Sequence, residues 1–262
     1  MPETDRALLA DAARAAGQIA LSYFKNDPSV VDKPDGAGPV TEADLAVNAM
    51  LERDLRAARP DYGWLSEETE DDSGRLRTKR QFVIDPIDGT RAFIAGNPDW
   101  AHSLAIVEEG RVLAAAVYLP VRDLMFTASF RGGATLNDAP VTVTRAGLDG
   151  ATLLGAKPNF APHHWRGGTP PVIQKFRSSL AYRLCLVAQG RYDGMITLRP
   201  SWEWDIAAGS LIAAEAGAKV TDQSDTALLF NNRHPQVAGV LAAGPELHAH
   251  LVQKLEPNTA TP

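Results

Sequence analysis

The chain has 262 residues, of which 45% are hydrophobic and 22% are charged, and its formal net charge is −6. This composition is typical of a soluble globular protein with a sizeable core, and it excludes fibrous and disordered classes. The negative charge argues against nucleic-acid binding, because phosphate backbones select clustered Lys and Arg.

We expect no membrane association and a cytoplasmic location, because the chain shows no long apolar run and no signal peptide. Its single cysteine, Cys185, excludes an internal disulfide and reads as a buried, inert thiol.

The first 60 residues predict two amphipathic helices with a polar loop between them. Apolar residues recur every three or four positions from Leu8 to Tyr23, which predicts the first helix. Residues 30–39 contain Gly and Pro and read as a loop. The second helix is expected to begin after Thr41, with Asp44 completing a capping box.

The middle of the chain predicts a set of short strands. Residues 62–65 form one candidate, and Phe82, Val83 and Ile84 predict a buried strand that Pro86 should end, because proline offers no ladder donor. Three further apolar segments predict an antiparallel meander that continues from this central strand, and they are residues 101–107, 112–118 and 124–128. His102 stands at the start of the meander. A core position and a functional role explain it equally well.

From about residue 151 strands and helices alternate again. The expected strands are residues 151–154, 195–198 and 239–243. The expected helices are residues 180–189, 205–216 and 245–255, and the middle one is apolar enough to be buried on most of its surface. The pattern predicts an α/β (α+β) fold with two lobes, residues 1–148 and 149–255, and a disordered tail at 256–262.

Four acidic residues stand at the ends of predicted elements: Glu67, Asp85, Asp88 and Asp205. Three of them have a simpler explanation when taken alone, and Asp85 is the exception: Asp205 can cap a helix, Glu67 can lie in a solvated loop, and Asp88-Gly89 is a common turn. Taken together, such carboxylates would repel one another by about 4 kcal/mol per pair at about 4 Å and an effective dielectric near 20. Bound cations would offset this repulsion, and an all-oxygen set suits Mg²⁺. The pattern therefore indicates a magnesium site for phosphate transfer or hydrolysis.

Three separated motifs then carry a resemblance to a known family. They are Ser66-Glu67-Glu68, Asp85-Pro86-Ile87-Asp88-Gly89-Thr90 and Trp204-Asp205-Ile206-Ala207-Ala208-Gly209. In this order they resemble the inositol monophosphatase superfamily of lithium-sensitive, magnesium-dependent phosphatases, and the resemblance covers nearly the whole chain. It implies a layered α-β-α-β-α sandwich of the inositol monophosphatase and fructose-1,6-bisphosphatase type.

The resemblance also implies roles for individual residues. Glu67, Asp85 and the backbone carbonyl of Ile87 would hold one Mg²⁺. Asp85, Asp88 and Asp205 would hold a second, and a third, weaker ion would share Glu67. Asp44 and Thr90 would orient and deprotonate the attacking water, with Glu67 counted among the catalytic groups. The residues assigned to phosphate or substrate binding are Asp88, Gly89, Thr90, Asp205 and Ser179.

The substrate prediction rests on the residues after the central motif. Gly89-Thr90-Arg91-Ala92-Phe93-Ile94 is more similar to the CysQ-type 3'(2'),5'-bisphosphate nucleotidases than to inositol monophosphatases, and Glu203 before Trp204 agrees with that branch. We therefore predict hydrolysis of adenosine 3',5'-bisphosphate to AMP and phosphate. The alternative is an inositol-1-monophosphatase or another small sugar or polyol phosphate phosphatase. The expected partners are the small phosphorylated substrate and, as in many family members, a second copy of the chain. The candidates to bind a second phosphate are Arg177, Arg183, Lys157 and Arg166.

Overall fold

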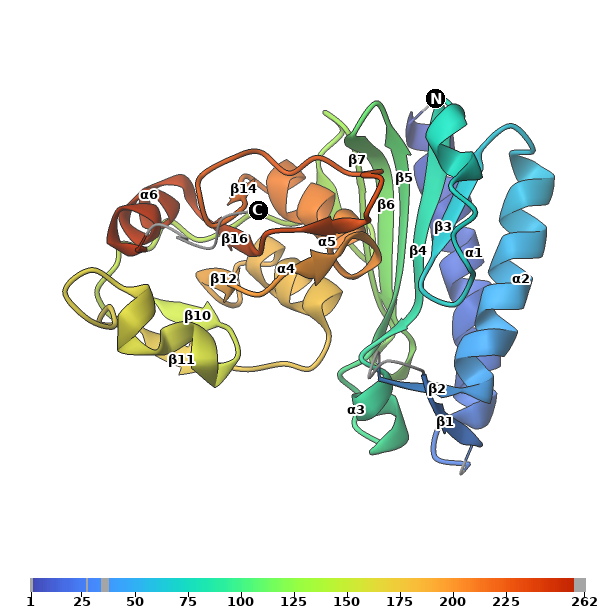
Figure 1. Ribbon diagram of the computed structural model, residues 1–262, viewed down its shortest axis with the longest axis horizontal. Coiled ribbons are helices and arrows are strands. Elements are labelled where there is room, and N and C mark those ends of the chain that lie inside the picture. The colour runs from blue at the N-terminus through green and yellow to red at the C-terminus, as the bar shows by residue number, and fades with distance from the viewer. Residues whose placement is uncertain (1, 27, 34–37, 257–262) are drawn as a thin grey trace.

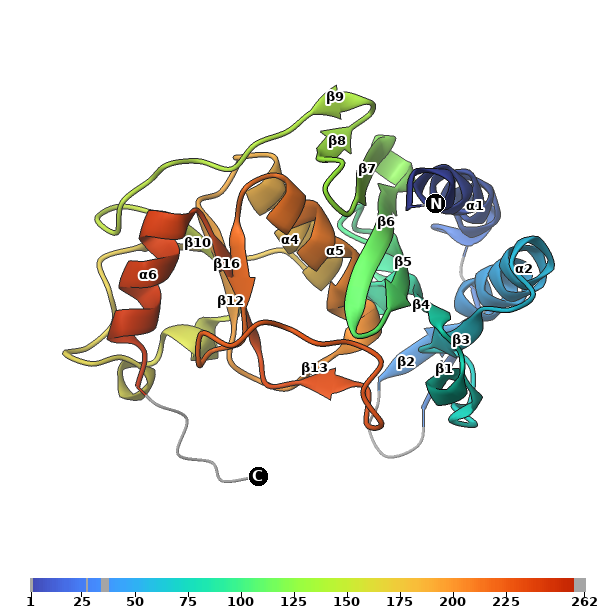
Figure 2. The ribbon, with the colours of Figure 1, turned by 90° about the horizontal axis from the view of Figure 1, so that it is seen from above.

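The computed structural model describes residues 2–26, 28–33 and 38–256, and the described chain forms five stacked layers (Figures 1 and 2). Across Figure 1 from right to left, these are a helix pair, a large sheet, a second helix pair, a smaller sheet and one helix. This order is the α-β-α-β-α sandwich that the resemblance implied, so the fold prediction is confirmed.

The helices form the two outer layers and the middle layer. Helices α1 and α2 cover the outer face of the large sheet, α4 and α5 fill the space between the sheets, and α6 covers the small sheet (Figure 1). Their bounds are α1 Pro2–Tyr23, α2 Glu42–Ala58, α3 Thr90–Ile94, α4 Leu180–Ala188, α5 Glu203–Glu215 and α6 Pro245–Lys254. Among the residues that the structure describes, no helix is long and apolar enough to cross a membrane.

The large sheet has seven strands in the order β3-β4-β5-β6-β7-β8-β9. Strand β3 runs parallel to β4, and the remaining neighbours are antiparallel, so the predicted meander is confirmed. The bounds are β3 Gly63–Ser66, β4 Arg80–Asp88, β5 Ala101–Glu108, β6 Arg111–Leu119, β7 Leu124–Ser129, β8 Ala134–Leu136 and β9 Ala139–Pro140. The expectation that Pro86 ends the central strand was wrong, because β4 continues to Asp88.

The smaller sheet has five strands in the order β11-β10-β12-β16-β14. Its bounds are β10 Thr152–Leu154, β11 Ile173–Lys175, β12 Gly194–Thr197, β14 Lys219–Thr221 and β16 Val240–Ala243. Two short antiparallel pairs complete the fold, namely β1 Val30–Asp32 with β2 Pro39–Thr41, and β13 Ser201–Trp202 with β15 Gln236–Val237.

Two further expectations concern segments that the structure describes only in part. Residues 30–39 were expected to be a loop, but they contain β1 and begin β2, because the two segments pair antiparallel with each other, with Val31 opposite Val40. Residues 34–37 lie outside the described part. Of the predicted tail, Glu256 is described and residues 257–262 are not. The division into lobes near residue 148 stays a prediction.

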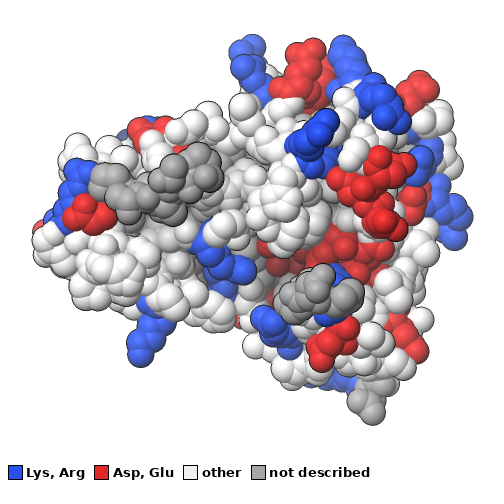
Figure 3. Space-filling view, viewed as in Figure 1, with Lys and Arg blue, Asp and Glu red and all other residues white. Residues whose placement is uncertain are grey.

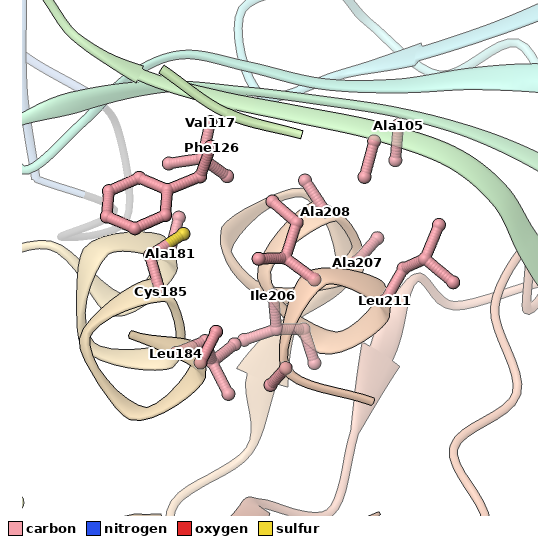
Figure 4. Close-up of a cluster of buried hydrophobic side chains, with 14 of the residues drawn as sticks. Ala105, Val117, Phe126, Ala181, Leu184, Cys185, Ile206, Ala207, Ala208 and Leu211 are labelled. Carbon is pink, nitrogen blue, oxygen red and sulfur yellow. The ribbon is translucent and has the colours of Figure 1, made fainter. Parts of the chain in front are cut away.

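The main core lies between the two sheets and is built around α4 and α5. Residues Ile206 to Ala213 of α5 are all buried, which confirms the prediction for this apolar helix. Figure 4 shows side chains from both helices packed together beneath the large sheet. Cys185 lies in this cluster, and burial raises the pKa of its thiol well above the usual value, as expected for an inert residue.

Gly209 allows α4 and α5 to approach closely enough to place their first turns beside β4. A Cβ atom at this position would lie 2.7 Å from the Cβ atom of Leu184 and 3.2 Å from the carbonyl oxygen of Ala181. Alanine has a better helix propensity than glycine by about 1 kcal/mol, but this contact would force the helices apart.

We predict that Gly209→Ala lowers the free energy of unfolding by about 1–3 kcal/mol, because overpacking outweighs propensity. Denaturant unfolding followed by circular dichroism would measure the change. Leu184→Gly removes the opposing Cβ and Cδ1 atoms, so the same substitution at position 209 should cost less in that background. Equal costs in both backgrounds would contradict the prediction.

Candidate active site

Strand β4 carries a bulge that brings two acidic side chains to one face of the large sheet. Asp85 pairs with Ser103 and Asp88 pairs with Ala101, so Pro86 and Ile87 together oppose the single residue His102. In a regular strand, residues three positions apart point to opposite faces. The extra residue in the bulge corrects this phase, so that Asp85 and Asp88 both point toward α4 and α5.

Two more acids reach the same place from other elements. Glu67 follows β3, and its N–H group donates to the carbonyl of Ile84 at 3.2 Å, which extends the parallel pairing by one residue. Asp205 lies in the first turn of α5, whose N-cap is Trp202, so the alternative that Asp205 caps this helix is wrong. One oxygen atom from each of Glu67, Asp85 and Asp205 lies within 4.8 Å of the others.

Asp88 is held by the N-terminus of α4. Its Oδ2 atom accepts hydrogen bonds from the Ser179 hydroxyl at 2.5 Å and from the N–H of Ala181 at 2.7 Å. Ser179 is also the N-cap of α4, where its oxygen accepts from the N–H of Tyr182. The structure therefore gives Ser179 the task of positioning Asp88, and its contact with substrate stays a prediction.

Asp44 and Thr90 form a second small constellation beside the acids. The Oδ2 atom of Asp44 accepts from the N–H and the hydroxyl of Thr41, at 2.8 Å and 2.5 Å, which confirms the predicted capping box. Its Oδ1 atom faces the hydroxyl of Thr90 at 3.4 Å. The hydroxyl of Thr90 also lies 3.2 Å from the carbonyl oxygen of Ile87.

Gly89 forms the corner between β4 and α3. It has φ of +102°, and a Cβ atom there would lie 3.2 Å from the carbonyl oxygen of Asp99. Only glycine adopts this backbone conformation readily and tolerates such a close approach. The corner places the first turn of α3 beside the acids, with the N–H groups that a helix start leaves without helical partners.

The sequence and the fold both match one family. Residues 1–260 match the model of the inositol monophosphatase family. The chain belongs to this family. It is 33% identical to an inositol-1-monophosphatase of Rhizobium meliloti, over 80% of this chain and 81% of that protein. It is 36% identical to the Nus factor SuhB of Salmonella typhimurium strain LT2, over 80% and 82% of the two chains. The solved IMPase of Thermotoga maritima covers 97% of this chain and 96% of its own, with a TM-score of 0.80 at 27% identity.

Membership explains why the acids lie together. Inositol monophosphatase family proteins are metal-dependent phosphatases that act on small phosphorylated compounds. The family resemblance is thus confirmed. These relatives are named inositol-1-monophosphatase, SuhB or IMPase, so the assignment to the bisphosphate nucleotidase branch stays a prediction.

The donor set fits a hard divalent cation. Burial raises the pKa of Asp85 well above its usual value, and the charges of Glu67, Asp88 and Asp205 raise it further. Burial, Asp88 and Glu67 raise the pKa of Asp205 in the same way. Among the described residues, this cluster contains carboxylates and neither His nor Cys. Ionised carboxylates this close need positive charge, and oxygen ligands of this kind suit Mg²⁺.

Lys33 provides a positive charge beside the acids, and the sequence analysis did not predict this position for it. Its ammonium group donates to Glu67 at 2.8 Å and to Glu68 at 2.6 Å. Burial nevertheless raises the pKa of Glu68 to about 7. Lys33 stands 34 positions before Glu67 in a segment expected to be a loop, and no spacing in the sequence connects the two. Only the β1–β2 pairing brings it to the acids.

The acids line a cleft of about 690 Å³. Figure 3 shows acidic side chains gathered in a hollow on the face that it presents. The same cleft is lined by Arg91 and Trp204, which stand in the motifs named above, and by three residues that the sequence analysis did not select, namely Phe176, Trp202 and Arg199. The rings of Trp202 and Trp204 are stacked, with centroids 4.7 Å apart and planes 8° from parallel.

The four basic residues expected to meet a second phosphate do not line this cleft. The guanidinium of Arg183 donates to the carbonyl of Arg177 and lies over the Phe176 ring. Arg177 contacts Tyr192 and Asp99. Arg166 pairs with Glu256, and Lys157 borders a separate cavity of about 430 Å³.

We predict that Mg²⁺ binding releases protons near pH 6 and weakens as the pH falls from 7.5 to 5.5. Burial raises the pKa of Asp44 and of Asp88 to about 6, and that of Asp85 and Asp205 further above the usual value. A raised carboxyl pKa keeps the proton on the metal-free protein to higher pH, and a cation must displace it. Calorimetric titration in two buffers of different ionisation enthalpy measures the protons released. Binding without proton release at pH 6 would contradict the prediction.

Proposed function

We propose that this chain is a Mg²⁺-dependent phosphomonoesterase that hydrolyses inositol 1-phosphate or a related small polyol phosphate. The observation that carries the proposal is the convergence of one oxygen each from Glu67, Asp85 and Asp205 within 4.8 Å. The Asp44–Thr90 pair lies next to this cluster. The named relatives support a polyol phosphate as substrate, because inositol monophosphatases are among them.

The acids would divide between two cation positions. Glu67, Asp85 and the carbonyl of Ile87 would hold one Mg²⁺, and Asp85, Asp88 and Asp205 would hold a second. A third, weaker position would share Glu67. When bound, such ions lower the pKa of a coordinated water and neutralise charge on the phosphoryl oxygens.

Asp44 and Thr90 supply the proton chemistry. Asp44 is buried, and burial raises the pKa of its carboxyl to about 6, so it is ionised at neutral pH and basic enough to take a proton from water. Thr90 lies within reach of Asp44 and can orient the same water through its hydroxyl. The water oxygen then attacks phosphorus while one of its protons passes to Asp44, and the bond from phosphorus to the alcohol oxygen breaks. The leaving alkoxide takes a proton from a solvent water, and Asp44 returns its proton to solvent.

The backbone at the start of α3 would hold the phosphate. The N–H groups of Gly89 and Thr90 stand at a helix start, where backbone donors favour an anion. Ser179 holds Asp88 by a hydrogen bond, which fixes the carboxylate that faces the same space. A phosphate in this position would lie between the acids and the first turn of α3. The expected homodimer stays part of the proposal.

A second candidate substrate is favoured by other residues that line the cleft. Arg199 and Arg91 line it, and neither makes an ion pair within the described part of the chain. Phe176 and the stacked Trp202 and Trp204 offer flat apolar surface nearby. Cationic and aromatic groups together would suit a nucleoside with a second phosphate, such as adenosine 3',5'-bisphosphate.

We predict that Asp85→Asn lowers turnover by about 1000-fold or more, because it removes a carboxylate shared by both cation positions and several kcal/mol of charge stabilisation. Phosphate release in Mg²⁺ would measure the effect. Asp11→Asn makes the same charge change on an exposed position of α1 and should leave turnover unchanged. Activity of Asp85→Asn near the wild-type level would refute the metal assignment.

We predict faster hydrolysis of inositol 1-phosphate than of adenosine 3',5'-bisphosphate when both are assayed side by side. A clear preference for the bisphosphate would select the second candidate.

If the bisphosphate is preferred, Arg199→Gln should raise KM for the bisphosphate about tenfold, because the substitution removes one charge-assisted contact. KM for inositol 1-phosphate should change little. Arg111→Gln, at the exposed start of β6, is the matched control.

A further inference from the structure

His102 lies opposite the bulge that brings Asp85 and Asp88 together. It is fully buried, and its Nδ1 atom forms a hydrogen bond with the carbonyl oxygen of Pro86. Pro86 and Ile87 are the two residues that share His102 as their only counterpart on β5. The imidazole thus contacts the backbone between the two acids without touching either carboxylate.

The bulge leaves a backbone acceptor that needs a donor. Where two residues oppose one, the ladder of backbone hydrogen bonds is interrupted. Pro86 also has no N–H group, so the local backbone can offer fewer donors than a regular strand. A buried carbonyl without a hydrogen-bond partner destabilises the fold. The imidazole of His102 satisfies this carbonyl from the side of the sheet that faces α1 and α2.

The protonation state of His102 follows from its surroundings. Burial lowers the pKa of its imidazole to about 4, so the ring is neutral at pH 7. A neutral ring that contacts a carbonyl must carry its proton on the contacting nitrogen, which is Nδ1. The Nε2 atom has no hydrogen-bond partner among the described residues, and the ring meets Trp100 edge to face at 5.6 Å.

Two further contacts, both made by the backbone of Ile87, hold the rest of the bulge. The N–H of Ile87 donates to Oδ1 of Asp85 at 2.9 Å, and the carbonyl of Ile87 lies 3.2 Å from the hydroxyl of Thr90. The Pro86 carbonyl completes this set, because its orientation fixes the peptide that joins Pro86 to Ile87. Loss of its donor would free the peptide to rotate, and the Ile87 N–H and the side chain of Asp85 would move with it.

We propose that His102 is a positioning residue for cation binding, which holds the β4 bulge so that Asp85 and Asp88 point to the same face. The inference rests on the proposed metal site and goes beyond the ligand set, because His102 touches no ligand side chain. Groups that orient metal ligands from behind typically change metal affinity 10- to 100-fold when they are removed. A residue that only filled space would change stability and leave affinity intact.

The test compares Asn and Leu at position 102. Both side chains have four heavy atoms in a branched arrangement, and the Nδ2 of Asn can take the place of Nδ1, whereas Leu offers no donor. We expect His102→Leu to weaken Mg²⁺ binding about 10- to 100-fold in calorimetric titration without substrate. His102→Asn should bind Mg²⁺ within about threefold of the wild type, although both variants melt at lower temperature.

Equal Mg²⁺ affinity in the wild type and both variants would overturn the proposal and leave a space-filling role. An equal loss in both variants would overturn it as well, because the donor would then not matter. If the wild type binds no Mg²⁺, the proposed function fails. The position of the His102 proton then still tests the hydrogen bond on which the inference depends.

That second measurement uses the wild-type protein. Long-range ¹H–¹⁵N correlation spectra distinguish the two neutral histidine tautomers, and the His102 signals can be assigned from their absence in His102→Asn. We expect the proton on Nδ1 across pH 6–8. A proton on Nε2 would overturn the proposal, even if the Leu variant fails to fold.

Discussion

The structure depends on placing like charges at one point inside a protein. Asp85 and Asp88 come from one strand, Glu67 follows its parallel neighbour, and Asp205 begins a helix from the middle layer. Buried carboxylates at such distances repel one another and raise their own pKa values, which opposes folding of the metal-free chain. The fold tolerates this cost because its two large cores lie on either side of the site.

The five-layer architecture explains how the acids are held without being neutralised by the protein alone. Lys33 pairs with Glu67 and Glu68, and the start of α4 donates two hydrogen bonds to Asp88. Asp85 accepts a hydrogen bond from the N–H of Ile87, and burial and neighbouring acids still raise the pKa values of Asp85 and Asp205 well above the usual value. The remaining demand for positive charge lies at the cluster of Glu67, Asp85 and Asp205.

The proposed function assigns the chemistry and the substrate contacts to different residues of the cleft. The acids, Gly89 and Thr90 come from the end of the large sheet and the starts of α3 and α5, and the proposal assigns phosphoester hydrolysis to them. The aromatic and basic part of the lining, with Arg199 and the stacked Trp202 and Trp204, comes from β13, the residues just before it and the first turn of α5.

Local patterns in the sequence determined much of this protein: the helix and strand periods, the capping box at Thr41, and the family through three motifs. They could not determine features that depend on pairing between distant segments. The bulge at Pro86 is visible only once β5 supplies one residue against two, since a proline by itself more often ends a strand. In the same way, Lys33 reached Glu67 through the β1–β2 pair, and His102 acquired a partner through the register of β4 and β5. Hydrogen bonds and charges across strands depend on three-dimensional distance, and the tertiary structure alone decided those distances.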